Sequence, residues 1–187
     1  LIGDYKNPIL QPWAAEIVKK FGELSLAGIT FPNPSNQCWP FPMPFTFKNY
    51  VVLVLQGRDT VTLVYANSEH DVRRIRMNAP HPKPLTPSWY GDSVGHYEGD
   101  TLVIDTVGYN DRFWFDARGT PHSEQLHTVE RFERTNLGQL KVETTVDDPG
   151  AYSKPWKVRR ELQLAPTMDL LEYVCNERPA EQHYVGR

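Results

Sequence analysis

The sequence predicts an all-β fold, an antiparallel β-barrel of the calycin or lipocalin type with about eight to nine strands. From about residue 45 onward, short runs of alternating apolar and polar residues are separated by turn residues, which is typical of strands with one wet face. No segment of this region has a helical repeat long enough for the crossovers of a parallel sheet. A meander of this many strands hides its edges most completely by closing into a barrel, so the β-sandwich is the second choice.

Nine strands are predicted, and most are joined by short antiparallel connections. The clearest of these connections are the turn-forming segments at residues 57–59, 98–100 and 135–138. The predicted strands cover residues 50–55, 60–65, 71–77, 93–97, 101–107, 126–134, 139–146, 156–164 and 168–176.

The strand predicted at residues 156–164 shows the alternation most clearly. One face carries the charged and polar residues that belong in solvent, and the other carries Trp156, Val158, Leu162 and Leu164 together with Arg160. The strand at 139–146 repeats the pattern with an inward face of Leu140, Val142, Thr144 and Val146. Each strand therefore has one face that must be buried against a core.

The chain is predicted to form a single domain, residues 1–187, in which residues 1–44 differ from the β-barrel body at 45–187. Seven of the 16 prolines lie in these first 44 residues, where they exclude long helices and sheet ladders. A short amphipathic helix is predicted after Pro12, because Trp13, Ile17 and Phe21 recur every four residues, and Gly22 is its expected end. We expect this proline-rich arm to wrap around the body, and a homodimer through the arm is an alternative use of it.

The composition excludes two classes of protein. The longest apolar run, residues 51–55, is far shorter than the roughly 20 residues of a membrane-spanning helix. The formal net charge of −3 argues against a nucleic-acid partner, since such proteins carry a basic excess. Phosphate-binding loops, dinucleotide fingerprints and the common hydrolase and metalloprotease motifs are absent, so no cofactor is expected.

The connection at residues 108–122 is the leading candidate for a binding site. It is about 15 residues long, and connections of that length are often lids or binding loops. Its aromatic residues Tyr109, Phe113 and Trp114 stand beside titratable groups, and a small-molecule site needs that combination of apolar area and fixed polar atoms. The alternative interpretation is a structural plug that caps one end of the barrel.

Histidine is the side chain best suited to cofactor-free proton transfer near neutral pH. We expect His122, at the end of this connection, to be the catalytic residue, with Asp111 as its orienting partner and Glu124 as a second choice. His127 follows at a spacing that matches no known zinc pattern, and no third ligand is evident, so no metal is expected. A purely structural role for each histidine remains the alternative.

Charged residues on inward strand faces form the last group of candidates. Alternation places Arg160, Glu130 and Glu172 on apolar faces, and it suggests the same for Asp105 and Arg74. A buried charge is costly unless it is paired, so Arg160 is expected to pair with Glu130 or Glu172. These pairs are either structural or form the polar floor of a cavity, with Glu130 as a catalytic and Arg160 and Glu172 as ligand-binding residues.

Three stretches carry a resemblance to known proteins: WYGDSVGHYEGDTLVIDTVGYND at 89–111, PHSEQLHTVERF at 121–132 and LEYVCNE at 171–177. Together they resemble a family of uncharacterised, mostly exported, β-rich bacterial proteins. The spacing of Cys38 and Cys175 alone leaves a disulfide and two free thiols equally open. The resemblance implies a removed leader and a periplasmic or extracellular location, which favours the disulfide. It implies no activity, so no catalytic residue is transferred.

The function predicted from these residues is a cofactor-independent barrel enzyme. It would perform acid–base chemistry of the lyase, isomerase or cyclase type on a small apolar or aromatic molecule. The alternative is a non-catalytic small-molecule binding or carrier protein of the lipocalin type that uses the same pocket.

Overall fold

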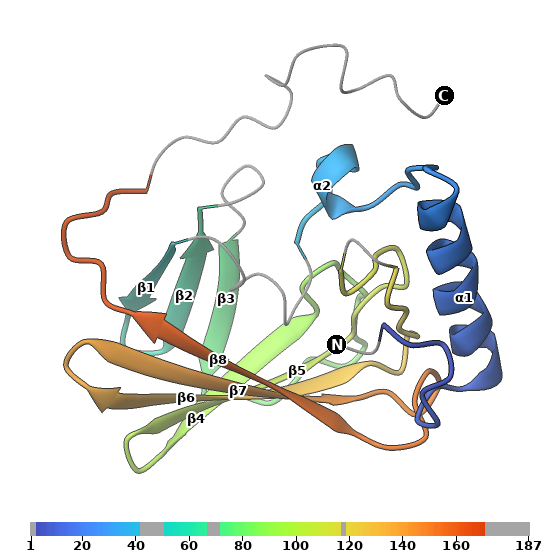
Figure 1. The fold of residues 1–187 in the computed structure, drawn as a ribbon. Coiled ribbons are helices and arrows are strands. Elements are labelled where there is room, and N and C mark those ends of the chain that lie inside the picture. The colour runs from blue at the N-terminus through green and yellow to red at the C-terminus, as the bar shows by residue number, and fades with distance from the viewer. Residues whose placement is uncertain (1–2, 42–50, 67–71, 117–118, 171–187) are drawn as a thin grey trace.

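The structure, a computed structural model, describes residues 3–41, 51–66, 72–116 and 119–170 (Figure 1). Within these ranges lie α1 (Pro12–Leu26), α2 (Pro34–Gln37), β1 (Val52–Gln56), β2 (Thr60–Tyr65), β3 (Val72–Met77), β4 (Asp92–Glu98), β5 (Thr101–Val107), β6 (His127–Asn136), β7 (Gln139–Asp147) and β8 (Trp156–Gln163). The strands form one sheet in the order β1 to β8, which curls into a half-barrel. The all-β, barrel-like prediction is confirmed, and the described residues form no second sheet of a sandwich.

Eight of the nine predicted strands occur within two residues of their expected ends. The ninth, residues 168–176, falls largely outside the described ranges. Every neighbouring pair is antiparallel except β3 and β4, which pair in parallel. A parallel pair needs a crossover of a dozen or more residues, and the connection at 78–91 provides it.

The inner face of the half-barrel holds the first of two hydrophobic cores. Its buried members are Val61, Leu63, Tyr65, Ile75, Leu102, Ile104, Phe132 and Val142. On β8 the half-buried and exposed residues alternate as predicted, with Lys157 and Arg159 in solvent. Leu164, expected on the inward face, instead lies beyond the end of β8 and is 60% exposed.

Two charged residues expected on inward faces point outward instead. Arg74 is exposed, and its neighbour Arg73 is the buried one. Asp105 lies on the outer face of β5, where His81 of the connection at 78–91 contacts it, and Val103 on the same face is buried. Because buried residues occur on both faces of β5, the alternation of apolar residues could not show which face is the inner one.

The buried charges pair differently from the prediction. Arg73 on β3 contacts Glu130 on β6 at 2.5 Å, and both side chains are almost fully buried. The side chain of Arg73 crosses the inner face of the curved sheet, and its guanidinium also donates hydrogen bonds to Ser93 on β4 (2.9 Å) and Thr106 on β5 (2.6 Å). Burial alone would lower the pKa of Arg73, but the charge of Glu130 raises it. The expected pairing of Arg160 with Glu130 is wrong, because the curl of the sheet brings β3 to the carboxylate.

Helix α1 begins at Pro12 as predicted but continues past Gly22, its expected end, to Leu26. A glycine inside a helix lowers its stability by only about 1 kcal/mol, so packing along the helix overrides it. The chain leaves the helix at Gly28, whose φ of +72° lies in the left-handed region that glycine adopts without strain.

Helix α1 covers the second hydrophobic core, at the end of the sheet where β5 leaves and β6 begins (Figure 1). The buried members of this core are Leu10, Ala14, Val18, Tyr109, Phe113, Phe115, Leu126, Val146, Ala151 and Tyr152. The N-terminal segment is held to the body by backbone hydrogen bonds, among them Gln11 N–H to Ala151 O at 2.8 Å. This part of the arm wraps around the body as expected.

The buried stripe of α1 is offset by one residue from the predicted one. Ala14 and Val18 are buried, whereas Trp13, the first residue of the predicted stripe, is 40% exposed. Ile17 and Phe21 are only partly buried. An apolar stripe is thus left accessible along one side of the helix.

Cys38 is disulfide-bonded. Cys175 and Glu172 lie outside the described residues, so the structure gives no account of the expected role of Glu172.

Candidate functional site

The connection between β5 and β6 divides its aromatic residues between the core and the surface. Tyr109 and Phe113 are buried in the second core, and the Tyr109 hydroxyl and Thr128 hydroxyl lie 2.7 Å apart. Burial raises the pKa of Tyr109 to about 12, so the phenol stays protonated. Trp114 is only half-buried. Tyr109 and Phe113, which were expected to form the walls of a site, are therefore core residues beneath the connection. Trp114 is the one of the three expected wall residues that reaches the surface.

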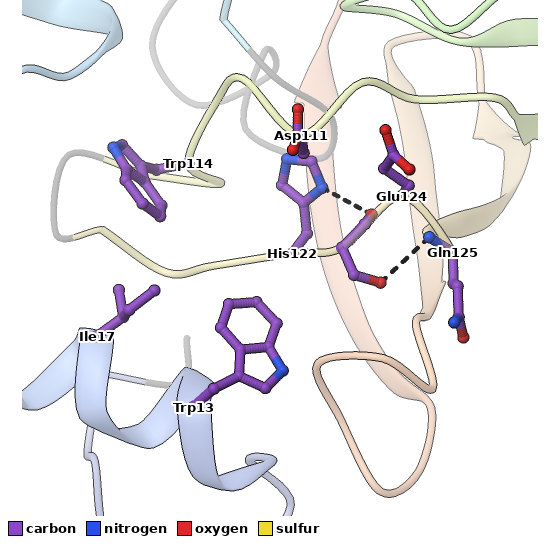
Figure 2. Close-up of a pocket in the computed structure, with 8 residues that line it drawn as sticks. Trp13, Ile17, Asp111, Trp114, His122, Glu124 and Gln125 are labelled. Carbon is purple, nitrogen blue, oxygen red and sulfur yellow. Dashed lines mark hydrogen bonds between the residues drawn. The ribbon is translucent and has the colours of Figure 1, made fainter.

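A pocket of about 480 Å³ lies between α1 and this connection, and we call it the α1 groove. Its lining residues are Trp13, Ile17, Asp111, Trp114, His122, Ser123, Glu124 and Gln125. Figure 2 shows the side chains of α1 on one side and those of the connection facing them. The volume falls within the range of small-molecule sites, and the walls combine aromatic faces with a few polar groups.

His122 lies at the floor of the α1 groove and is 5% exposed. Its ring packs against those of Phe113 and Phe115, with centroids 3.9 and 5.2 Å away. Burial lowers the pKa of His122, against the opposing effects of backbone carbonyls and of the charges of Asp148 and Asp111. The imidazole is therefore neutral near pH 7.

The hydrogen bond of His122 to the backbone favours one tautomer. Nδ1 lies 3.1 Å from the backbone carbonyl of Ser123 (Figure 2), which only accepts, so Nδ1 carries the proton. Nε2 is enclosed and forms no hydrogen bond of normal geometry within the described ranges, although the backbone of Phe113 lies close enough to raise the pKa of the ring. This nitrogen is left with the lone pair that a general base needs.

Asp111 lines the α1 groove beside His122 but forms no hydrogen bond with it in the described structure. The contact of the imidazole is instead with the backbone of Ser123. That residue is held by the buried Asp148, which accepts hydrogen bonds from the Ser123 amide (2.6 Å) and hydroxyl (2.5 Å). Asp148 was missed because it lies in an Asp-Asp-Pro-Gly segment that has the composition of an ordinary turn.

The predicted polar floor does not join this site. Glu130 belongs to the first core with Arg73, and Arg160 lies on β8, and neither lines the α1 groove. Trp13 and Ile17 of α1, which were predicted as core residues of the helix, complete the groove instead. The sequence did hold a signal for this: Ala14 and Val18 form a second apolar stripe, one residue along the helix from Trp13 and Ile17. Only one of the two stripes can face the core fully.

A second group of titratable residues lies on the outer face of the sheet. His81, in the 78–91 connection, bonds Asp92 through Nδ1 (2.6 Å) and Asp105 through Nε2 (2.8 Å), and His127 bonds Asp105 at 2.8 Å. Burial would lower the pKa of His81, but the two carboxylates raise it. Burial would raise the pKa of Asp105, but the two histidines lower it. These contacts hold the crossover connection against β4 and β5.

No group of three or more histidine, cysteine, aspartate or glutamate residues in the described ranges is arranged to hold a metal ion. The helices described are all too short or too polar to span a membrane.

Comparison of the chain with models of protein families, with curated proteins and with solved structures gave no match. The site must therefore be interpreted from its own residues.

Proposed function

We propose that the protein binds a small molecule with an apolar or aromatic body in the α1 groove, and that His122 transfers a proton to or from it. The observation that carries this proposal is the position of a buried, neutral imidazole opposite the accessible apolar side chains Trp13 and Ile17. Apolar walls supply binding energy in proportion to the area they bury. A base whose pKa lies near or below neutral pH is ready to accept a proton.

The proposed chemistry is a proton transfer that needs no cofactor. Nε2 of His122 accepts a proton from an acidic C–H of the ligand, and the electron pair of that bond moves onto an adjacent carbonyl as an enolate. Return of the proton to a different atom gives an isomerase, and loss of a leaving group gives a lyase. The resulting imidazolium would be stabilised by the nearby carboxylates of Asp111 and Asp148, whose charges already act on the ring.

The alternative proposal is a non-catalytic binding or carrier protein with the same groove. It is favoured by the enclosure of Nε2, which a ligand reaches only after part of the lining moves. The two proposals share the ligand class and differ in whether His122 changes its protonation state during binding.

The compound 2-indanone separates them, because it has an apolar bicyclic body and acidic protons beside its carbonyl. Binding is measured by the fluorescence of the groove tryptophans, and proton transfer by exchange of the acidic protons in D₂O, followed by NMR. The enzyme proposal expects His122→Ala to slow exchange by about 100-fold or more while binding persists. The matched control is His96→Ala, which removes an imidazole with a half-exposed side chain on β4 and should change nothing.

Binding without accelerated exchange in the wild-type protein would favour the carrier. Absence of any binding of 2-indanone, with no change in fluorescence at saturating concentration, would count against the α1 groove as a site for this class of ligand.

The location of the protein belongs to the same proposal. We propose that it is exported, to the periplasm or beyond the cell, and the disulfide at Cys38 supports this because disulfides persist in oxidising compartments. Fractionation of cells that express the complete protein from its own gene tests it, and recovery in the cytoplasmic fraction would contradict it.

A further inference from the structure

The charged side chains that line the α1 groove are all acidic. Asp111 and Glu124 contribute carboxylates, and the lining contains no lysine or arginine. Neither carboxylate takes part in an ion pair within the described ranges, where the ion pairs lie on the strands, on α1 and on the outer face. Both residues are exposed at the rim, so a bound ligand would meet them without displacing a partner.

Two tryptophans stand on the same groove with their orientations fixed. The indole N–H of Trp13 donates a hydrogen bond of 2.8 Å to the carbonyl of Gly150, although the side chain is 40% exposed. Trp114 packs against Phe21 of α1 in an edge-on arrangement, with ring centroids 4.9 Å apart. Figure 2 shows Trp13 and Ile17 on α1, with Trp114 of the connection across from Ile17.

Indole faces attract cations through the negative face of the ring, and tryptophan is the strongest of the aromatic residues in this respect. Because these rings are held in place, binding does not have to order them first. Carboxylates at the rim add a Coulomb attraction for the same charge, whereas the floor presents the neutral imidazole of His122 and adds no competing cation.

From this arrangement we propose that the α1 groove selects amines, with a protonated ammonium group on a compact apolar or aromatic body. The body would lie between Trp13, Ile17 and Trp114, and the ammonium group would be directed toward Asp111 and Glu124. The inference rests on the proposed function, because it names the ligand class of the same groove. A carboxylate ligand of the same shape would be repelled by the rim.

Three indane derivatives test the selection with one ring system: 2-aminoindane as the cation, 2-indanol as the neutral compound and indane-2-carboxylate as the anion. Affinities are measured by tryptophan fluorescence and by calorimetry. The amine should bind about tenfold more tightly than the alcohol, and the carboxylate most weakly. Raising the salt concentration to about 0.5 M should weaken binding of the amine and leave that of the alcohol unchanged.

The double variant Asp111→Asn/Glu124→Gln keeps the shape of the rim and removes its charge. It should lose about tenfold in affinity for 2-aminoindane and remain within about twofold for 2-indanol. Glu161→Gln, on the solvent face of β8, is the matched control and should alter neither affinity.

If the alcohol binds as tightly as the amine, or if the double variant weakens both equally, selection of amines is overturned while the proposed binding function stands. If none of the three compounds binds and 2-indanone also fails to bind, the proposed function fails with it.

Discussion

Removal of one partner of the buried ion pair in the half-barrel is expected to destabilise the protein strongly. In Arg73→Met, the carboxylate of Glu130 would stay in a place where it is 0% exposed, without the guanidinium 2.5 Å away. Ser93 and Thr106 would also lose the donor that now joins them to β3. A buried charge left without its partner costs about 3–5 kcal/mol, which is a large fraction of the stability of most domains.

The magnitude is best measured as a cycle of variants. The free energy of unfolding is obtained from urea titrations followed by circular dichroism, for Arg73→Met, Glu130→Leu and the double variant. Because the double variant leaves no unpaired charge, it should recover most of the loss and come within about 2 kcal/mol of the wild-type protein. Glu133→Gln, which breaks an exposed pair with Lys141, serves as the control and should change stability by at most about 0.5 kcal/mol.

Two results would refute this reasoning. One is a loss below about 1 kcal/mol in Arg73→Met, which would mean that the carboxylate of Glu130 is not desolvated. The other is a double variant no more stable than either single variant, which would mean that the two charges are not coupled.

Three further predictions concern the elements around the site. The pKa of His81 is raised, so the stability that its charge contributes is complete below about pH 6.5 and is lost as the pH rises through the raised pKa. The difference in Tm between the wild-type protein and His81→Gln should therefore narrow between pH 6 and 9. A difference in Tm that stays constant would contradict a charged His81 between Asp92 and Asp105. Gly119 has a φ of +77° and lies against the ring of Phe21, so Gly119→Ala should destabilise the protein by about 1–2 kcal/mol or more. Gly22 has open space around it, so Gly22→Ala should stabilise the protein by up to about 1 kcal/mol. Equal effects of the two variants in urea titrations would count against this packing. Asp148→Ala should lower stability by about 2 kcal/mol and speed hydrogen exchange of the Ser123 amide; unchanged protection of that amide would show that Asp148 does not hold it.

Local pattern was enough to identify most of the sheet. Strands such as β7 and β8 have one face in solvent, and their alternation reports directly which residues are inward. Alternation failed at β5, where buried residues occur on both faces. It also could not choose between Arg73 and Arg74, because consecutive residues point to opposite faces and a shift of one residue exchanges them.

The candidate site was found only in part for a related reason. The connection between β5 and β6 was recognisable by its length and its aromatic residues, and His122, Asp111 and Trp114 do line one groove. The sequence did not show that Tyr109 and Phe113 lie beneath this connection. An aromatic residue looks the same in a sequence whether it lines a binding site or packs in a core. The other wall comes from α1, about 100 residues earlier in the chain, and such a long-range contact leaves no local pattern.

The most direct test of the central claim is NMR of the imidazole nitrogens of His122 at pH 7, with and without 2-indanone and 2-aminoindane. The neutral ring with its proton on Nδ1 should be observed in the free protein, and its resonances should shift on titration with the same Kd that tryptophan fluorescence gives. The resonances of His96, half-exposed on β4, should not move. A doubly protonated His122 at this pH, or a ring whose resonances are unchanged when fluorescence shows the groove to be saturated, would contradict the account.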